Sequence, residues 1–481
     1  MHTNRPTPDM PPAAAAPSDA AAAARAFTEL QLAPEVIANL ARLGYHTMTP
    51  IQAAALPLAL GGHDLIAQAK TGSGKTATFG LPLLGKLNPR SLRMQAMVLC
   101  PTRELADQVA KELRRLARAE ENIKILTLCG GTPIRPQLDS LAHGAHIVVG
   151  TPGRLLDHLD RGSLKLEALN TLVLDEADRM LDMGFFDDIV AVAQACPPHR
   201  QTLLFSATYP EGIASLAARF LRQPREVKLE EQHGADKIRQ RFYEVAHPQR
   251  LEAVVRLLRH YRPVSTLAFC NTRQQCRDLV EVLHAHGIHA LALHGELEQR
   301  ERDQVLVQFA NRSCSVLVAT DVAARGLDIA GLEAVINVDV TPDPEVHVHR
   351  IGRTGRADEA GWALSLASSA DRRRVDAIAQ AQRFEPEWHT LDALPGDNEE
   401  ALLPPMATLQ ILGGRKDKIR PGDVLGALTG EAGLSREQVG KIHVTDSYTY
   451  VAVTRTIVNE ALHRLANGRI KGKRLKVRPL E

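Results

Sequence analysis

The chain has 481 residues, of which 44% are hydrophobic, so it is long enough for about three domains with cores of ordinary size. Its longest apolar run, residues 53–62, is far shorter than the roughly 18 residues that a membrane-spanning helix needs, which argues against a membrane protein. Six cysteines are scattered without a CxxC pair, which argues against both a zinc site and a disulfide framework. We therefore expect a soluble protein of a reducing compartment, the cytoplasm.

The charge is unevenly distributed along the chain. Residues 404–481 contain 14 Lys and Arg against 7 Asp and Glu, a net charge of +7. Because the whole chain carries +2, residues 1–403 carry −5. A basic segment of this kind is typical of a module that binds polyanions, and an ordinary solvated lysine-rich surface is the alternative.

Short runs rich in valine, isoleucine and leucine alternate with longer helical patterns in two successive sets. The first set comprises residues 64–69, 96–100, 123–128, 145–150, 171–176 and 201–206. The second set comprises residues 265–270, 289–294, 315–320, 333–339 and 363–368. Such alternation is typical of βαβ units and of parallel sheets that are buried on both faces. The sequence therefore predicts two tandem α/β domains.

Changes in composition predict where the domains begin and end. The start is rich in alanine, is broken by prolines and lacks the leucine-type core of a signal peptide. A stretch near residue 390 is rich in proline and acid and poor in periodicity, which is typical of a linker. We expect a disordered tail over residues 1–26, α/β domains over 27–232 and 233–384, a linker over 385–404 and a small basic α+β domain over 405–481.

The sequence AKTGSGKT at residues 69–76 lies between a strand-like run and a helix-compatible run, which is the context of a phosphate-binding loop. Glycines in this loop let backbone N–H groups face a phosphate at a helix N-terminus. Lys75 can reach the β and γ phosphates, and the Thr76 hydroxyl can ligate Mg²⁺. A plain glycine-rich turn is the alternative. The candidate residues are Ala69, Lys70, Thr71, Gly72, Ser73, Gly74, Lys75 and Thr76.

Three carboxylates follow the strand-like run that ends at residue 174. Asp175 would hold the metal ion, and Glu176 would act as general base on the attacking water. Their repulsion is tolerable because Mg²⁺ and Lys75 supply positive charge. Taken alone, the same acids are also typical of a helix N-terminus, where the helix dipole favours negative charge. The phosphate-binding loop makes the catalytic interpretation the better one.

Together, DEAD at residues 175–178 and AKTGSGKT resemble the motifs of DEAD-box RNA helicases. Further stretches match that family in its order: GYHTMTPIQ, PTRELA, TPGR, SAT, AFCNTR, QRER, ATDVAARGLD and HRIGRTGR. The resemblance covers about residues 27–370. It implies two tandem RecA-like parallel-sheet domains and an RNA-dependent ATPase that uses Mg²⁺ and hydrolyses ATP to ADP and phosphate.

The resemblance also implies roles for individual residues. Phe27 and Gln52 would recognise adenine, and Gly326 and Asp328 would bind the nucleotide, with Asp328 on the ribose. Arg353 and Arg356 would act as arginine fingers on the γ-phosphate. Without the family, HRIGRTGR is a cluster of four cations that needs an anion nearby, whether phosphate or carboxylate.

Two further groups follow from the same resemblance. Coupling of hydrolysis to RNA binding would involve Asp178, Ser206, Thr208 and His349. The RNA contacts of the two domains, mainly to sugar and phosphate, would come from Pro101, Thr102, Arg103, Gly131, Thr151, Arg154, Arg273 and Thr320.

The C-terminal segment resembles the RNA-binding domain of DbpA-type helicases, an RRM-like α+β module. Tyr448 and Tyr450 are two residues apart, so they share one face of a predicted strand, where they either stack on RNA bases or pack in the core. Asp446 and Gln410 stand where a standard RRM prefers a basic and an aromatic residue. Basic residues would therefore contribute more than stacking, namely Lys416, Lys418, Arg469, Lys471 and Lys473.

Three functional classes compete. The resemblance favours a monomeric ATP-dependent RNA helicase that remodels large-subunit ribosomal RNA in pre-ribosomal particles. A DNA-translocating helicase is a second class, against which the DEAD and SAT motifs argue. An ATP-dependent RNA clamp or chaperone with little unwinding is the third, and it would use the same residues as the first.

Overall fold

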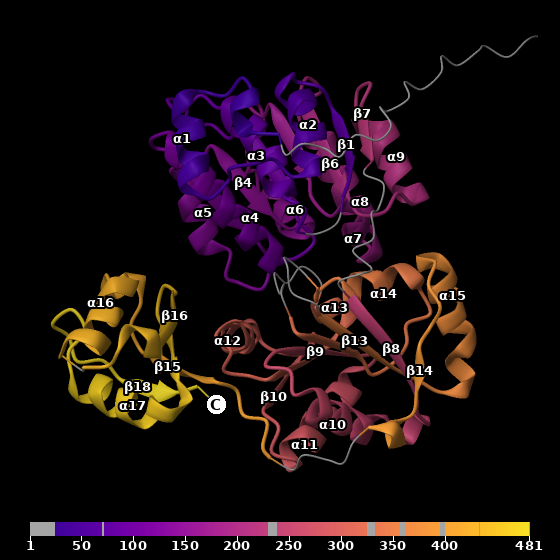
Figure 1. The fold of residues 1–481 in the computed structure, drawn as a ribbon. Helices are drawn as coiled ribbons and strands as arrows, with labels where there is room; N and C mark the ends of the chain where they lie inside the picture. The colour runs from indigo at the N-terminus through magenta and orange to yellow at the C-terminus, as the bar shows by residue number, and fades with distance from the viewer. Residues whose placement is uncertain are drawn as a thin grey trace, which may run out of the picture. The chain divides into compact units, whose positions relative to one another are not determined.

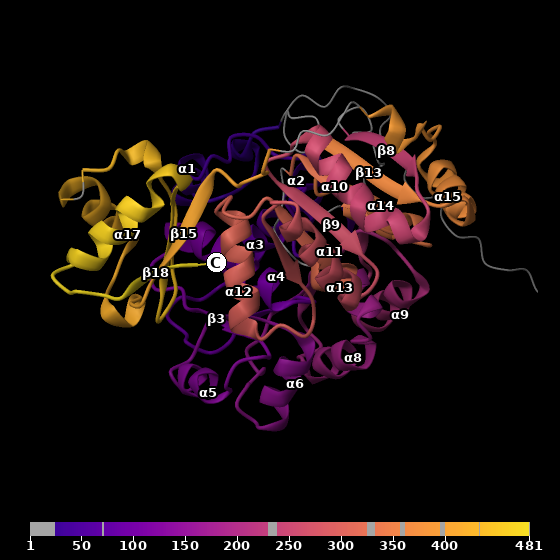
Figure 2. The same cartoon turned by 90° about the horizontal axis from the view of Figure 1, so that it is seen from below.

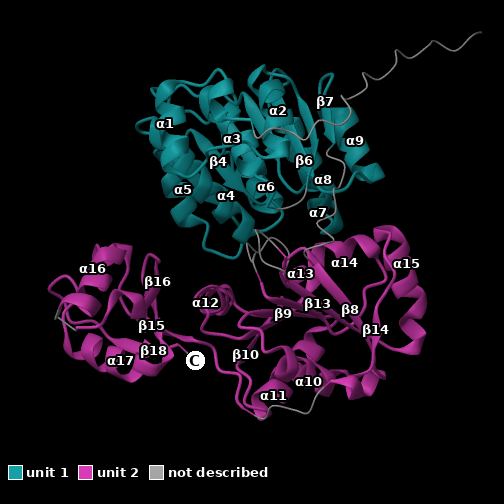
Figure 3. Ribbon diagram, viewed as in Figure 1, with its two compact units in different colours: residues 1–230 teal, residues 231–481 magenta. Residues whose placement is uncertain are grey.

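The computed structural model describes residues 25–69, 72–228, 238–324, 332–355, 361–394, 400–431 and 433–480. The chain divides into two compact units, unit 1 over residues 1–230 and unit 2 over residues 231–481 (Figure 3). Residues 1–24 of the predicted tail lie outside the described residues. Within the described ranges, no helix is long and apolar enough to cross a bilayer.

Unit 1 is built on a seven-stranded parallel sheet with the order β3-β4-β2-β5-β6-β1-β7 (Figure 1). Its strands are β1 (Leu65–Gln68), β2 (Ala96–Leu99), β3 (Ile125–Leu128), β4 (Ile147–Gly150), β5 (Thr171–Leu174), β6 (Gln201–Ser206) and β7 (Arg225–Lys228). Every residue of β2, β4, β5 and β6 is buried. This confirms the parallel sheet that the apolar runs predict.

Helices cover both faces of this sheet because successive strand residues point to opposite sides. Ala96 and Val98 of β2 face one apolar core, whereas Met97 and Leu99 face the other. The first core is closed by α2 (Pro50–Leu60), α3 (Lys75–Gly85) and α4 (Arg103–Leu116). The second is closed by α6 (Pro152–Asp160), α7 (Ala177–Asp182), α8 (Phe186–Ala195) and α9 (Glu211–Phe220). The remaining helices of unit 1 are α1 (Pro34–Arg42) and α5 (Arg135–Ala142).

Unit 2 contains a second seven-stranded parallel sheet with the order β10-β11-β9-β12-β13-β8-β14. Its strands are β8 (Ile238–Glu244), β9 (Thr266–Cys270), β10 (Ala290–Leu293), β11 (Val316–Thr320), β12 (Ala334–Asn337), β13 (Gly361–Ala367) and β14 (Trp388–His389). Its helices are α10 (Arg250–Tyr261), α11 (Arg273–Ala285), α12 (Gln299–Ala310), α13 (Asp321–Ala324), α14 (Pro344–Ile351) and α15 (Arg372–Gln382). The second predicted α/β domain is therefore present.

Part of the predicted linker belongs to this second sheet. Trp388 and His389 pair with β8, and their rings contact Phe242 and Tyr243, with centroids 5.9 and 5.6 Å apart. Leu402 is buried in the core of the same domain. The proline-rich composition hid these residues from sequence analysis, because a strand of two residues has no periodicity to detect.

The rest of unit 2 is a small antiparallel sheet with the order β16-β17-β15-β18, shown in yellow with its helices in Figures 1 and 2. The strands are β15 (Met406–Ile411), β16 (Val439–Val444), β17 (Thr449–Thr454) and β18 (Val477–Pro479). Helices α16 (Pro421–Gly426) and α17 (Val458–Asn467) bury Val424 and Leu465 against the sheet residues Leu409 and Val451. This C-terminal domain has the predicted α+β fold.

Candidate nucleotide site and RNA-contact residues

The nucleotide candidates of unit 1 meet at one edge of its sheet. The loop that ends at Gly74 follows β1, Asp175 follows β5, and Ser206 ends β6. Because β5, β6 and β1 are adjacent and parallel, their carboxyl ends lie side by side, which is where α/β sheets bind ligands. The structure thus brings together residues that are up to about 130 positions apart in the sequence.

Backbone geometry and two side chains define the phosphate-binding loop. Gly72 and Gly74 have φ angles of 82° and 95°, in the left-handed region that favours glycine. Gln52 Nε2 donates a hydrogen bond to the Gly74 carbonyl at 3.1 Å, and Thr49 Oγ1 donates to the Ser73 carbonyl at 2.8 Å. A Cβ atom at Gly74 would lie 2.5 Å from Gln52 Nε2, so this approach requires glycine. Lys70 and Thr71 lie outside the described residues.

Several buried charged atoms of this site have no hydrogen-bond partner among the described residues. Two of them are Lys75 Nζ, in the first turn of α3, and Asp175 Oδ1, just beyond β5. Burying a charge without partners is costly unless a ligand completes its contacts. A phosphate against Lys75 and a cation against Asp175 would complete both. The residues present therefore fit a nucleotide with a divalent cation.

The titration of Asp175 agrees with a cation site. Burial raises the pKa of Asp175 to about 6, the charge of Lys75 opposes that rise, and the charge of Glu176 adds to it. The described residues include no cluster of three His, Cys, Asp or Glu side chains that could hold a metal by themselves. Mg²⁺ needs no such cluster, since it is commonly bound by one or two carboxylates together with phosphates and water. Thr76, half-buried in the first turn of α3, is the second candidate ligand.

Glu176 has an unusual backbone conformation. Its φ and ψ are 53° and 52°, in the left-handed region, which costs a residue with a side chain on the order of 1 kcal/mol. Its carboxylate is buried, and Oε2 lies 3.4 Å from Arg179 Nε. Strain of this kind is common where the chain must place a functional group, so Glu176 remains the candidate general base.

The predicted coupling residues of unit 1 contact one another. Asp178 Oδ2 accepts hydrogen bonds from the backbone N–H groups of Ala207 and Thr208, at 3.0 and 3.1 Å, and from Thr208 Oγ1 at 3.3 Å. The Asp178 N–H donates to Ser206 Oγ at 3.3 Å, and Ser206 Oγ donates to the Thr208 carbonyl at 2.6 Å. The last acid of DEAD is therefore tied directly to SAT.

Phe27 and Gln52 are both buried in unit 1. Phe27 packs with Leu40 and Met48 and meets the ring of Tyr45 edge-on at 6.0 Å. The Gln52 side chain makes two hydrogen bonds. Its Nε2 donates to the Gly74 carbonyl, and its Oε1 accepts from the Thr49 N–H at 2.9 Å. Their contact with adenine stays a prediction, and Gln52 has the additional task of holding the phosphate-binding loop.

The RNA candidates of unit 1 lie beyond the other half of the sheet. Pro101, Thr102 and Arg103 follow β2, Gly131 follows β3, and Thr151 and Arg154 follow β4. These three strands are adjacent, so the sheet separates the RNA candidates from the nucleotide candidates while keeping both on one edge.

Two of these candidates organise their surroundings. Thr102 caps α4 by accepting a hydrogen bond from the Leu105 N–H, which places Arg103 at the first position of the helix. Arg154 Nη2 donates to the Thr132 carbonyl at 2.9 Å and so holds the loop that contains Gly131. Arg103 Nη1 is buried without a hydrogen-bond partner among the described residues.

In unit 2, Arg273 follows β9, and Thr320 is the last residue of the adjacent strand β11. Arg273 begins α11 and pairs with Glu296 at 3.0 Å, and Arg277 pairs with the same carboxylate at 2.7 Å. Thr320 Oγ1 accepts a hydrogen bond from the Ala323 N–H at 3.4 Å. Sequence analysis did not single out Glu296, although an acid three residues before QRER is visible in the sequence.

The cationic motif HRIGRTGR lies on α14 and just beyond it. His349 is on the helix, and Arg353 follows it with only 5% of its surface exposed. Arg350 pairs with the carboxylate of Asp321, Nε at 2.7 Å and Nη2 at 2.6 Å. The anion that this first arginine needs is thus a carboxylate of the same unit. Gly326, Asp328 and Arg356 lie outside the described residues.

The two tyrosines of the C-terminal domain differ in their surroundings. Tyr450 is 3% exposed, and its hydroxyl accepts a hydrogen bond from Gln410 Nε2 at 3.2 Å. Base stacking, one of the two alternatives, is therefore not supported for Tyr450, because its ring is covered. Tyr448 lies just before β17, is half-buried, and has the Arg300 guanidinium over its ring at 5.0 Å.

Basic side chains gather on two loops of this domain. Lys471 Nζ donates to the Lys418 carbonyl at 2.6 Å, and Lys473 lies 3.6 Å from Asp417, so the loop at residues 415–418 adjoins the loop at 469–473. The predicted cations of both loops are exposed: Lys416, Lys418, Arg469, Lys471 and Lys473. Sequence analysis missed a second basic group that lines a cavity of about 650 Å³ with Tyr448, namely Arg300, Arg474, Lys476 and Arg478.

Comparisons with known proteins agree with this arrangement. Residues 49–216 match the DEAD/DEAH box helicase family, residues 249–358 the helicase conserved C-terminal domain, and residues 408–479 the DbpA RNA binding domain. The chain is 53% identical over 457 residues to the ATP-dependent RNA helicase DbpA of Escherichia coli, covering 95% of this chain and all of that protein. It is 43% identical to the DEAD-box ATP-dependent RNA helicase CshA of Geobacillus kaustophilus, over 78% of this chain and 81% of that one.

Solved structures give the same result. The structure of S. cerevisiae Dbp5 bound to RNA and ADP BeF3 matches with a TM-score of 0.70 and 30% identity, over 77% of this chain and 96% of that chain. Both helicase sheets, the motifs at their carboxyl edges and the basic C-terminal domain thus have counterparts in one family. This chain belongs to the DEAD-box ATP-dependent RNA helicases, and it ends in an RNA-binding domain of the DbpA type.

Proposed function

We propose that this helicase hydrolyses ATP to ADP and phosphate in an RNA-dependent reaction and locally unwinds or remodels ribosomal RNA during assembly of the large ribosomal subunit. The proposal includes pre-ribosomal particles as its partners and a monomer in the cytoplasm. The observation that carries its catalytic part is a pair of buried atoms at the carboxyl edge of the first sheet, Lys75 Nζ and Asp175 Oδ1, for which the described part of the chain offers no hydrogen-bond partner. Its ribosomal part is supported by the likeness to DbpA and by the exposed cations of the C-terminal domain.

The residues of unit 1 would divide the work on ATP. The loop at residues 69–74 and Lys75 bind the phosphates, and Thr76 and Asp175 hold Mg²⁺, which when bound neutralises charge on the β and γ phosphates. Glu176 orients the attacking water and accepts its proton. Arg353 and Arg356 supply positive charge to the γ-phosphate, and Asp328 and Gly326 bind the nucleotide from the second helicase domain.

Hydrolysis would be coupled to RNA binding because the RNA candidates and the nucleotide candidates lie on the two halves of the same carboxyl edge of the sheet. Contacts at Thr102, Arg103, Thr151 and Arg154 go to sugar and phosphate, which positions a strand without reading its bases. Asp178 and the Ser206–Thr208 segment, which are hydrogen-bonded to each other, lie on the nucleotide half of the same edge. A strand gripped along its backbone and bent loses its pairing locally, and hydrolysis releases it.

The C-terminal domain would select the RNA target. We propose that it spans residues 405–481 and that its cationic loops anchor a hairpin of large-subunit ribosomal RNA. With domains over 27–232 and 233–384, the helicase core then acts on duplexes near that anchor. Gathered cations favour this role over a merely solvated surface, because Lys418 and Lys471 are held together by a hydrogen bond between their two loops.

An ATPase and strand-displacement experiment tests the proposal. Turnover by the full chain is measured without nucleic acid, with poly(U), with DNA, and with a ribosomal hairpin fragment, and displacement of a short duplex beside that hairpin is followed in parallel. The proposal predicts strong stimulation by the hairpin fragment, weaker stimulation by poly(U), none by DNA, and displacement that requires ATP. Stimulation by DNA would indicate a DNA helicase, and ATP-dependent RNA retention without displacement would indicate the clamp.

A further inference from the structure

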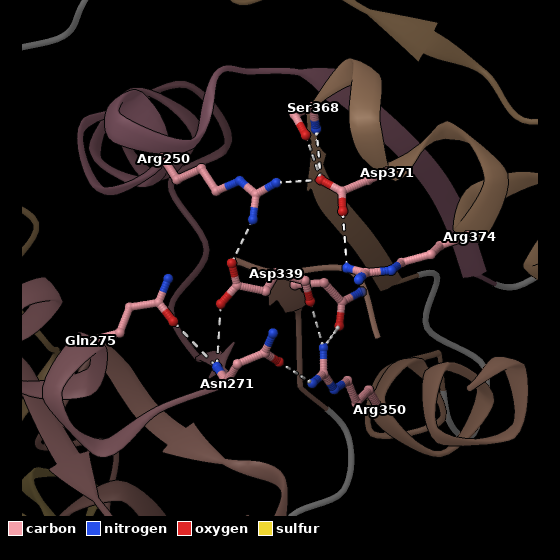
Figure 4. A network of polar contacts seen from close by, with 9 residues as sticks. Arg250, Asn271, Gln275, Asp339, Arg350, Ser368, Asp371 and Arg374 are labelled. Atoms are coloured by element: carbon pink, nitrogen blue, oxygen red, sulfur yellow. Dashed lines mark hydrogen bonds and ion pairs between the residues drawn. The ribbon is translucent and has the colours of Figure 1, made fainter. Parts of the chain in front are cut away.

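A buried network of charged groups joins five segments of the second helicase domain (Figure 4). Arg250, at the start of α10, donates to Asp339 Oδ1 and to Asp371 Oδ2, each at 2.5 Å. These partners are 89 and 121 residues away in the sequence, and all three side chains are at most one-tenth exposed. An ion pair so deeply buried makes a fixed junction, because removing one charge leaves the other uncompensated.

The two carboxylates of this network have different neighbours. Asp371 is held by its own loop, since Oδ2 also accepts from the Ser368 N–H and hydroxyl and Oδ1 accepts from Arg374. Burial alone would raise the pKa of Asp371, but the hydrogen bonds from Ser368 and the charge of Arg250 bring it below its usual value. Asp371 thus completes a local turn, and it contacts neither β9 nor α14 among the interactions drawn in Figure 4.

Asp339, by contrast, touches both functional segments of the domain. Its Oδ2 accepts from the Asn271 N–H at 3.2 Å, and its backbone carbonyl accepts from Arg350 Nη1 at 2.7 Å. Arg350 Nη2 lies 3.5 Å from Asn271 Oδ1, so the three residues close a ring of contacts, which Figure 4 shows at its centre.

These contacts place Asp339 between two elements that the proposed function uses. Asn271 directly precedes Thr272, whose side chain caps α11 through the Gln275 N–H, and Arg273 is the first residue of that helix. Arg350 is three residues before Arg353, and it is anchored on its other side by Asp321, directly after Thr320. Asp339 therefore borders the RNA-contact loop through its carboxylate and the helix that leads to the arginine finger through its backbone carbonyl.

We propose that Asp339 is a positioning residue that fixes the α11 start and α14 in one arrangement, so that RNA contact at Arg273 and the placement of Arg353 depend on each other. The inference rests on the proposed roles of Arg273 and Arg353. Asp339 touches neither substrate; its carboxylate, which Arg250 orients, holds Asn271, and its backbone carbonyl holds Arg350. The network thus connects the RNA contact at Arg273 with the placement of Arg353.

The substitution D339N in the full chain tests this. Asparagine keeps the size of the side chain but cannot accept from Arg250 and Asn271 with both atoms. We expect the half-activating RNA concentration to rise and the maximal RNA-stimulated turnover to fall, each by about tenfold, within the range typical of coupling between sites. ATP affinity without RNA should be unchanged, because the phosphate-binding loop of unit 1 is unaltered and the inference makes the placement of Arg353 depend on RNA contact.

D371N is the matched control, since it removes the other carboxylate that pairs with Arg250 but leaves Asn271 and Arg350 untouched. Both variants should lose thermal stability, whereas only D339N should lose RNA activation. If D339N does not fold, R250Q/D339N replaces it, because there the charge opposite residue 339 is removed as well. Equal loss of activation in D339N and D371N, or normal activation in D339N, would overturn the inference. Absence of RNA stimulation in the unaltered chain would instead contradict the proposed function.

Discussion

The two helicase sheets have the same strand order, and in each sheet a buried acid follows the same strand. The two acids differ in their hydrogen-bond partners. β5 in the first sheet corresponds to β12 in the second, and Asp175 and Asp339 follow them. Both carboxylates are buried, yet within the described ranges Asp175 Oδ1 has no hydrogen-bond partner, whereas Asp339 bonds to Arg250 and Asn271. In the proposed function, the same topological position thus serves a ligand in one domain and the protein's own contacts in the other. Between these two acids, an unsatisfied carboxylate oxygen, and not burial, marks the candidate binding site.

The largest effect is expected at the arginine finger of the second domain. R356A should lower RNA-stimulated turnover by about 10³- to 10⁵-fold, the contribution of such arginines in related phosphoryl transfers. Steady-state ATPase assays at saturating RNA measure this, with R372A as control, because Arg372 is an exposed arginine paired with Glu244 in the same domain. If residues 1–232 alone hydrolysed ATP at the full-length rate, the first domain would be sufficient for hydrolysis. The second domain would then contribute no arginine finger.

The next effect concerns Glu176. E176Q should lower turnover by about 10²- to 10⁴-fold, because the amide cannot accept the proton of the attacking water, while ATP and RNA binding persist. Turnover and equilibrium RNA binding with ATP should be measured on the same preparation. E211Q, which alters an exposed acid in the first turn of α9, should behave like the unaltered chain. Near-normal turnover in E176Q would remove Glu176 from its catalytic role.

Stability should respond in opposite directions at the two acids. D175N should raise the free energy of unfolding at pH 7.5 by on the order of 3 kcal/mol, because it removes an ionisation that burial makes unfavourable. D339N should lower it by about 1.5 to 3 kcal/mol, because it weakens hydrogen bonds to a buried charge.

The pH dependence gives this prediction its sign. The pKa of Asp175 is raised in the folded state to about 6, so the ionised acid destabilises the fold above pH 6. This destabilisation disappears as the acid protonates between pH 6 and about 4. Thermal unfolding of both variants should therefore be followed from pH 4.5 to 7.5. A stabilising effect of D175N that did not shrink toward low pH would show that ionisation of Asp175 is not its cause, and a destabilising effect would mean that Asp175 is paired in solution, as Asp339 is.

The smallest effect concerns the C-terminal cations. K416A/K418A/K471A/K473A should raise the half-activating concentration of a ribosomal hairpin by about tenfold and leave activation by poly(U) nearly unchanged. Each lost phosphate contact should also lower the slope of log affinity against log salt by roughly 0.7 to 0.9. R436A/K441A, which removes two exposed cations elsewhere in the domain, is the control. Equal losses for both RNAs would show that the loops attract any polyanion.

Point variants are preferable here to removal of residues 404–481. Thr408 Oγ1 accepts from Asn311 Nδ2 at 3.1 Å and lies 2.6 Å from Ser313 Oγ, and both contacts are buried. Deleting β15 would therefore leave polar groups of the preceding domain exposed or unpaired. Loss of activity after truncation would then mix two causes.

The central strands could be predicted from the sequence because burial on both faces makes them continuous apolar runs. β7 and β8 escaped because most of their residues are polar and at least partly exposed, which leaves no run to recognise. The nucleotide loops were also predictable, since each motif is contiguous and directly follows its strand.

Partners across long separations could not be predicted. Nothing near Arg250 in the sequence indicates Asp339 or Asp371, because the fold alone brings them together. The spacing of Tyr448 and Tyr450 gave a shared strand face but not what covers it, so the burial of Tyr450 needed the structure. The motif HRIGRTGR indicated only that its cations need an anion, and for one of them, Arg350, the structure shows that this anion is the carboxylate of Asp321.

The left-handed backbone at Glu176 puts stability and catalysis in conflict at a single residue. Glycine there would relieve the torsional strain, and asparagine tolerates the conformation better than most residues, so either replacement could make the first domain more robust. Either would also remove the carboxylate that we propose as the proton acceptor. Selection for heat resistance alone would therefore drift toward inactive helicases at this residue, whereas selection for turnover keeps the domain below the stability that its sheet could reach.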